Sequence, residues 1–162
     1  KDSNASFEGV AVGGDTLFVA NERNIGRIIA VDLASMKIKD HFQVTPVDCP
    51  AHDIHYTDLC WYAGDLWVLC RESHCVLQVN PKNHKVLAEF DYSDLELSRD
   101  TAYFNPYPGY GFFEGLAVDA THIWLAIDNN GFPRIAAPKD TRPSLYRCPR
   151  PDVARAKDAR TP

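Results

Sequence analysis

Acidic residues recur at matching places in three similar stretches of the sequence. Glu8 stands before Gly9 in FEGVAV, and Glu114 stands before Gly115 in FEGLAV. In the third stretch, YTDLCW, Asp58 takes the place of the glycine. Carboxylates that converge supply the oxygen ligands of a hard cation such as Ca²⁺, which takes about six to eight of them. The pattern predicts a calcium site formed by Glu8, Asp58 and Glu114. The alternative is that Glu8 and Glu114 accept hydrogen bonds from backbone amides of the neighbouring blade.

A second group of potential ligands lies between residues 45 and 55, where Cys49, His52, Asp53 and His55 occur close together. Zinc accepts such side chains, but their spacing does not form a pair of chelating knuckles. Asp53 and His55 come directly before a predicted strand, which makes them candidates for a general base or for a ligand contact. The simpler interpretation is that loop histidines are solvated or locally hydrogen-bonded.

Charged and amide side chains also gather where the second predicted strand of each similar stretch ends. Glu22, Glu72 and Asp128 lie at these corners. Nearby arginines can pair with an anionic group, although Asn and Asp also serve as plain turn formers. The residues predicted to bind substrate are Arg23, Arg71, Arg134 and Asn129.

Five cysteines occur, so at least one must stay outside any intramolecular disulfide. Cys70 and Cys75 flank a four-residue corner, which predicts that they face each other on adjacent strands. A disulfide there would form in an oxidising compartment, with Cys49 and Cys148 as a second potential pair. The alternative is that these are buried apolar side chains, as expected for Cys60.

The elements that must position these residues come from an internal repeat. Residues 113–130, FEGLAVDATHIWLAIDNN, match residues 7–24, FEGVAVGGDTLFVANERN, without a gap, and residues 56–73 form a third copy. Each copy has an apolar run, a Gly/Asp/Thr turn and a second run rich in aromatic and β-branched residues. This pattern is typical of a β-hairpin.

The first two copies continue through two further predicted strands, giving four antiparallel strands in about 40 residues, the size of a β-propeller blade. We therefore predict an all-β protein with three four-stranded antiparallel blades at about residues 7–44, 56–92 and 113–148. In the third copy, residues 144–148 follow an insertion and are the expected third strand, and a fourth strand is not visible. Residues 149–162 are predicted to be a flexible tail.

Three blades do not close a ring, because propellers typically have about four to eight. We expect half of a six-bladed ring, completed either by sequence beyond these 162 residues or by a second copy of the chain. A formal charge of −5 argues against a nucleic-acid partner. No apolar run approaches the roughly 18 residues that a membrane helix needs.

Two long segments connect the predicted blades, and loops of this length are often functional. The second should begin with a short helix over residues 93–100, capped by Ser93 or Asp94. It continues with the aromatic sequence TAYFNPYPGYGFF. These rings could line a pocket for an apolar or sugar-like small molecule, or simply cover the end of the ring.

Several of these motifs together resemble a known family. FEGLAVD, IWLAIDNNG and DTRPSLYRC in the third copy, FEGVAV and LFVANER in the first, and DLCW and LWVLCRES in the second are similar to the bacterial phytase-like propellers described as having esterase-like activity of phytase. The resemblance covers about residues 7–148 and corresponds to the C-terminal half of such a protein.

The resemblance implies a six-bladed propeller in the periplasm or secreted, with calcium-dependent hydrolysis of ester or phosphoester bonds. Under it, Glu8, Asp58 and Glu114 would face the central channel, and Glu22, Glu72 and Asp128 would face its rim. The alternative function is a non-enzymatic propeller that serves as a binding or scaffold module.

Overall fold

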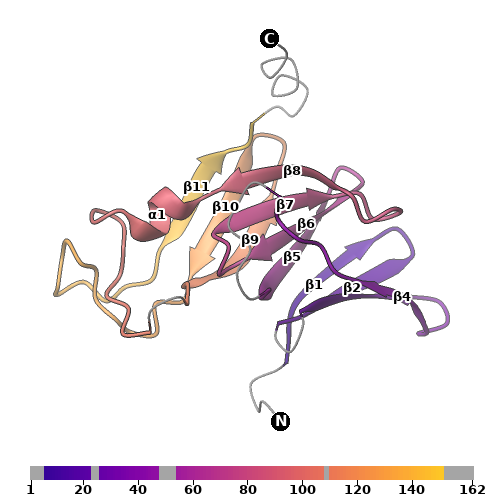
Figure 1. Cartoon of the computed structure of the whole chain (residues 1–162), viewed down its shortest axis with the longest axis horizontal. Helices are drawn as coiled ribbons and strands as arrows, with labels where there is room; N and C mark the ends of the chain where they lie inside the picture. The colour runs from indigo at the N-terminus through magenta and orange to yellow at the C-terminus, as the bar shows by residue number, and fades with distance from the viewer. Residues whose placement is uncertain (1–5, 23–25, 48–53, 108–109, 152–162) are drawn as a thin grey trace.

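The computed structural model describes residues 6–22, 26–47, 54–107 and 110–151. They form three antiparallel sheets that follow one another along the chain, from β1–β4 through β5–β8 to β9–β11 (Figure 1). In every sheet, neighbours in sequence are neighbours in space, so each sheet is a simple meander. This arrangement confirms the predicted class, a chain of β-propeller blades.

The first blade contains β1 (Phe7–Gly13), β2 (Thr16–Asn21), β3 (Arg27–Asp32) and β4 (Ile38–Phe42). The second contains β5 (Tyr56–Tyr62), β6 (Asp65–Cys70), β7 (Cys75–Val79) and β8 (Val86–Asp91). The third contains β9 (Phe113–Val118), β10 (His122–Ile127) and β11 (Leu145–Pro149). The four-stranded pattern thus holds for the first two blades, and the described part of the third has three strands.

The short helix α1 (Ser93–Leu97) follows β8. The N-cap residue of this helix is Tyr92, which makes no side-chain capping hydrogen bond, so the prediction of Ser93 or Asp94 as the N-cap was wrong. The backbone amide of Ser93 instead donates to Asp91 at 2.7 Å. The described residues contain no helix long and apolar enough to cross a membrane.

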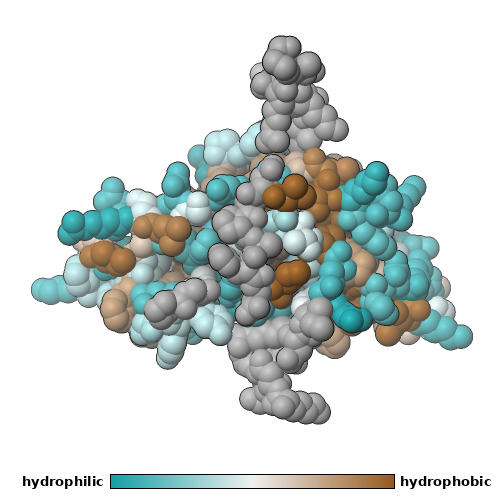
Figure 2. Space-filling view, viewed as in Figure 1, coloured by the Kyte–Doolittle hydropathy of each residue, from teal (hydrophilic) through white to brown (hydrophobic). Residues whose placement is uncertain are grey.

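Apolar side chains between consecutive blades form two cores. In β1 every second residue is buried, because only one face of this sheet meets another blade. In β6 five consecutive residues are buried, because the second blade lies between the other two. The first core includes Phe18, Leu59 and Leu66, and the second includes Trp67 and Leu125. On the face drawn in Figure 2, hydrophobic side chains appear in small groups between hydrophilic ones.

The innermost strands β1, β5 and β9 pack side by side. At Gly9 a Cβ atom would lie 2.6 Å from the Cα of Asp58, so only glycine permits this approach of β1 to β5. The hydroxyl of Tyr56 donates to the carbonyl of Val44 at 2.6 Å and accepts from its amide at 2.8 Å. These contacts hold the start of the second blade against the end of the first.

Candidate functional site

A β-bulge lies near the start of every innermost strand. Glu8 is the extra residue in β1, Thr57 in β5 and Glu114 in β9, because the residues on either side pair with consecutive positions of the next strand. A bulge bends its strand and redirects the side chain it carries. Thr57, not Asp58, is therefore the structural counterpart of the two glutamates. Its hydroxyl donates to the carbonyl of Phe113 at 3.0 Å and joins the second blade to the third.

Asp58 is used by backbone amides. Its carboxylate accepts from its neighbour Leu59 at 2.8 Å and from Leu116, on the next blade, at 2.7 Å. Burial raises the pKa of Asp58, and the two amide hydrogen bonds partly offset that rise. Bonding of this kind was the alternative expected of Glu8 and Glu114, and the structure shows it at Asp58.

Arg71 is the centre of a buried ion-pair network. Each of its three guanidinium nitrogens donates to a different carboxylate: Nη2 to Glu22 at 2.7 Å, Nε to Glu72 at 2.8 Å, and Nη1 to Glu114. The side chains of Arg71, Glu22 and Glu72 are 7%, 4% and 4% exposed, whereas Glu114 is 36% exposed. Four charged groups from three blades therefore meet at one point, and most of them are shielded from water.

His55 extends this network on the side of the second blade. Its Nδ1 lies 2.9 Å from Glu72 Oε2, and both side chains are buried. Burial raises the pKa of Glu72, but the contacts with His55 and Arg71 outweigh burial and hold the pKa below its ordinary value. His55 is thus a neighbour of the buried Glu72, and its ring centroid lies 6.3 Å from that of Tyr110.

The electrostatics of Glu114 are different. Burial raises its pKa, Arg71 opposes the rise, and the nearby charges of Glu22 and Glu8 add to it. Burial lowers the pKa of Arg71, but its carboxylate partners outweigh burial and hold it above the ordinary value. Among the residues that the structure describes, three carboxylates surround this one guanidinium.

The structure separates the remaining predicted residues from this network. Asn129 is buried in the insertion of the third blade, where its side-chain amide donates to the carbonyls of Phe132 and Thr141, the latter at 2.9 Å. The guanidinium of Arg134 lies over the ring of Tyr103 at 4.8 Å and donates to Ser144. Arg23, Asp53, Cys49 and His52 lie outside the described residues.

Metal and disulfide predictions can be compared with these positions. Among the described residues, no group of three or more His, Cys, Asp or Glu side chains could hold a metal ion. Asp58 and Glu114 are committed to amide and guanidinium partners, so the described residues do not fit a six- to eight-coordinate Ca²⁺ by themselves.

Cys70 and Cys75 are buried and stand directly opposite each other in the register of β6 and β7, without a disulfide joining them.

A pocket of about 320 Å³ lies beside the network, between the corner after β6, α1 and the aromatic segment before β9. His74 Nδ1 lies 2.9 Å from the largely buried carboxylate of Glu96. The hydrogen bond with Glu96 raises the pKa of His74, and burial partly opposes this rise. The pocket is lined by His74, Glu96, Leu97, Ala102, Tyr103, Asn105, Tyr110, Phe112 and Ile135.

The aromatic sequence was the signal for this pocket, whereas Glu96 was missed because one acidic residue on a short helix has no distinctive spacing.

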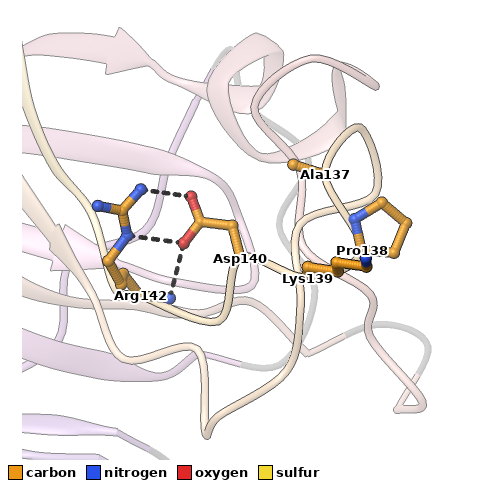
Figure 3. A pocket seen from close by; sticks show the side chains of 5 residues that line it. All are labelled: Ala137, Pro138, Lys139, Asp140 and Arg142. Atoms are coloured by element: carbon orange, nitrogen blue, oxygen red, sulfur yellow. Dashed lines mark hydrogen bonds and ion pairs between the residues drawn. The ribbon is translucent and has the colours of Figure 1, made fainter.

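A second depression lies on the insertion of the third blade and is open to solvent. Figure 3 shows Asp140 and Arg142 paired with each other at its edge, with 2.8 Å between Arg142 Nε and Asp140 Oδ1. Since this pair is internally satisfied and Ala137, Pro138 and Lys139 complete the lining, the depression offers no convergent polar groups.

Comparisons with known proteins support the fold. No protein-family model matches the chain, and no curated protein sequence matches it. Among solved structures, the computationally designed Ika4 protein is similar with a TM-score of 0.50 and 10% identity, over 91% of this chain and 74% of that one. The Cps50 (Swd1) β-propeller domain of Myceliophteria thermophila has a TM-score of 0.48 and 18% identity, over 96% of this chain and 42% of that one.

The WD40 domain of Pan2 from Neurospora crassa has a TM-score of 0.49 and 10% identity, over 78% of this chain and 31% of that one. The chain thus spans well under half the length of these two natural propeller domains. The sheet order and packing define this chain as a set of β-propeller blades, and the comparisons go no further than the fold.

Proposed function

We propose that this chain is part of a propeller that acts as a binding module, with its ligand site in the pocket beside Arg71. The observation that carries this proposal is the saturation of Arg71 by three carboxylates. An arginine held in this way is not available to bind an anionic ester. His55 is also held beside the buried Glu72. In this proposal Arg71, one of the predicted substrate-binding residues, serves to join the blades.

The pocket supports a small, uncharged ligand. Its walls include the aromatic side chains of Tyr103, Tyr110 and Phe112, and its acidic and basic groups, Glu96 and His74, are paired with each other. Aromatic walls with a few polar groups suit sugars and other neutral ring compounds, because such ligands stack on the rings and hydrogen-bond at the edges. We assign the pocket to this class of ligand.

Saturation-transfer NMR with neutral monosaccharides and simple aromatic alcohols tests the assignment. Tyr110→Ala removes a half-exposed pocket wall, and Tyr107→Ala, an exposed tyrosine outside the lining, is the matched control. We expect signals from at least one of these probes with the wild type and with Tyr107→Ala, and none with Tyr110→Ala. Signals from none of them, or signals that survive in Tyr110→Ala, would refute the pocket as the site.

A second candidate is the hydrolase that the family resemblance implies, an extracytoplasmic phytase-like propeller that uses Ca²⁺. The observation in its favour is that Glu8 and Glu114 are both bulge residues and that the charge of Glu8 helps to raise the pKa of Glu114, beside Arg71. In this case they would supply two ligands, and the other oxygens would come from outside the described residues or from substrate.

Assays with p-nitrophenyl acetate and p-nitrophenyl phosphate, in Ca²⁺ and in EDTA, separate the two functions. The binding module predicts equal background rates for the wild type and Glu114→Gln. Calcium-dependent turnover that Glu114→Gln abolishes would establish the hydrolase instead.

A further inference from the structure

The outward face of the first blade is apolar and uncovered. Val10 and Val12 on β1 are 63% and 55% exposed. Leu17 and Val19 on β2 continue the same face and are only half-buried, as is Ile29, the register partner of Val19 on β3. Contiguous exposed apolar surface of this kind is characteristic of a surface that another protein covers.

The repeat shows what normally covers this face. Val10 corresponds to Leu59 in the second blade and to Leu116 in the third, at the sequence offsets that align the copies. Those two leucines are 3% and 8% exposed and belong to the cores formed with the preceding blade. The same holds for the counterparts of Leu17, which are Leu66 and Ile123. The open face of the first blade therefore has the composition of a face that receives another blade.

The opposite face of the third blade is the natural complement. In the first blade, Ala11, Phe18 and Ala20 form the face that packs on the next blade, and all three are buried. The counterparts in the third blade are Ala117, Trp124 and Ala126. They repeat the pattern of a small, an aromatic and a small side chain, but Ala117 is exposed and the other two are half-buried.

A glycine on the innermost strand of the third blade independently indicates that another blade can pack there. Gly9 allows β1 to approach the backbone of β5, and Gly115 is its counterpart in β9. The three nearest atoms to a Cβ at Gly115 all belong to Ala126 of the same sheet, so no following blade occupies this position among the described residues. The third blade thus has both the face and the backbone clearance that the first blade uses to receive the next one.

We propose that two copies of this chain close a six-bladed ring, in which the outward face of the first blade of each copy packs on the outward face of the third blade of its partner. Each copy supplies three blades, and six is within the range of about four to eight found in propellers. Each contact joins two different faces, a first blade and a third blade. The ring closes because a two-fold axis relates the two copies and so produces the same contact twice. A second copy can occupy both faces at once, because this chain itself presents both complementary faces.

Size-exclusion chromatography with light scattering, and circular dichroism on the same samples, tests the ring. We expect twice the 18.2 kDa mass of one chain, little changed by high salt because the contact is apolar. Val10→Asp and Ala117→Asp lie on different faces, and each should reduce the mass to 18.2 kDa with the β spectrum retained. Val47→Asp, at an exposed valine outside both faces, should remain dimeric.

Mixing the two monomeric variants adds a test specific to the ring. A Val10→Asp copy and an Ala117→Asp copy can still form one undamaged contact, between the third blade of the former and the first blade of the latter. We expect the mixture to recover a weak dimer that neither variant forms alone. A monomeric wild type, or a dimer that Ala117→Asp leaves intact, would overturn the proposal, the second result because it would mean that first blades pack on each other.

Discussion

Replacing Arg71 by methionine should destabilise the protein strongly. The substitution keeps an unbranched side chain but leaves the buried carboxylates of Glu22 and Glu72 without the guanidinium that compensates them. Removing one partner of a buried ion pair typically costs about 3–5 kcal/mol, because the remaining charge is left without compensation. Here two nearly buried carboxylates and the half-exposed Glu114 lose the same partner, so we expect a loss toward the upper part of that range.

Urea denaturation at neutral pH measures this loss as a change in the free energy of unfolding. Arg99→Met, at an exposed position, is the matched control and should stay within about 0.5 kcal/mol of the wild type. Arg71→Lys should lie between the wild type and Arg71→Met, because an ammonium group keeps the charge but lacks the planar fork that reaches three carboxylates.

Acid conditions make the test more specific. Near pH 4.5, the ordinary pKa of a glutamate, Glu72 of Arg71→Met can take up a proton, and the difference in stability from the wild type should shrink. A loss below about 1 kcal/mol at neutral pH, or a loss that does not depend on pH, would refute the view that Arg71 holds the blades together by compensating buried charge.

Three further predictions concern contacts around the network. The hydrogen bond with Glu96 raises the pKa of His74 above 6.5, so the stability that this pair contributes should be fully present below pH 6.5 and lost as the pH rises through the folded-state pKa. Melting temperatures measured against pH should show this fall, and His74→Gln should remove it. In Asp58→Asn only one of the two carboxylate oxygens remains an acceptor, so the backbone amide of either Leu59 or Leu116 loses its partner. The substitution should cost about 1–3 kcal/mol in urea denaturation, and an unchanged midpoint would contradict the assigned bonding. Tyr56→Phe removes a buried hydroxyl that bonds the amide and the carbonyl of Val44 and should also cost about 1–3 kcal/mol; a negligible change in the free energy of unfolding would contradict this bonding.

The fold could be predicted because its determinants are local and repeated. Apolar residues at every second position and Gly/Asp turns set each hairpin, and the ungapped match of residues 7–24 with 113–130 places the hairpins in an array. The expected stretch at residues 144–148 indeed contains most of β11. The aromatic segment before β9 does line a pocket, as the sequence suggested.

The site was harder to predict because its residues meet only through the packing of blades. Arg71 contacts Glu22 and Glu114 at sequence separations of 49 and 43. A partial signal was present: Glu22 and Arg71 occupy equivalent positions in the first two copies, have opposite charges and do pair in the structure. The equivalent residue of the third copy is Asp128, but the partner that this blade supplies to Arg71 is Glu114.

The three carboxylates of the calcium prediction are not equivalent in the structure. The prediction grouped Asp58 with Glu8 and Glu114, although Asp58 lies one position further along the repeat. One residue reverses the direction of a side chain on a strand. The bulges at Glu8, Thr57 and Glu114 then fix which side chains are redirected, and Asp58 is left to bind backbone amides.

The central claim is that these carboxylates join blades rather than bind a metal, and a thermal melt in EDTA and in millimolar Ca²⁺ tests it most directly. Our account predicts the same melting temperature in both solutions for the wild type and for the Glu8→Gln/Glu114→Gln double variant. A higher melting temperature of the wild type in Ca²⁺, absent from the double variant, would contradict the account and make Glu8 and Glu114 ligands of the ion.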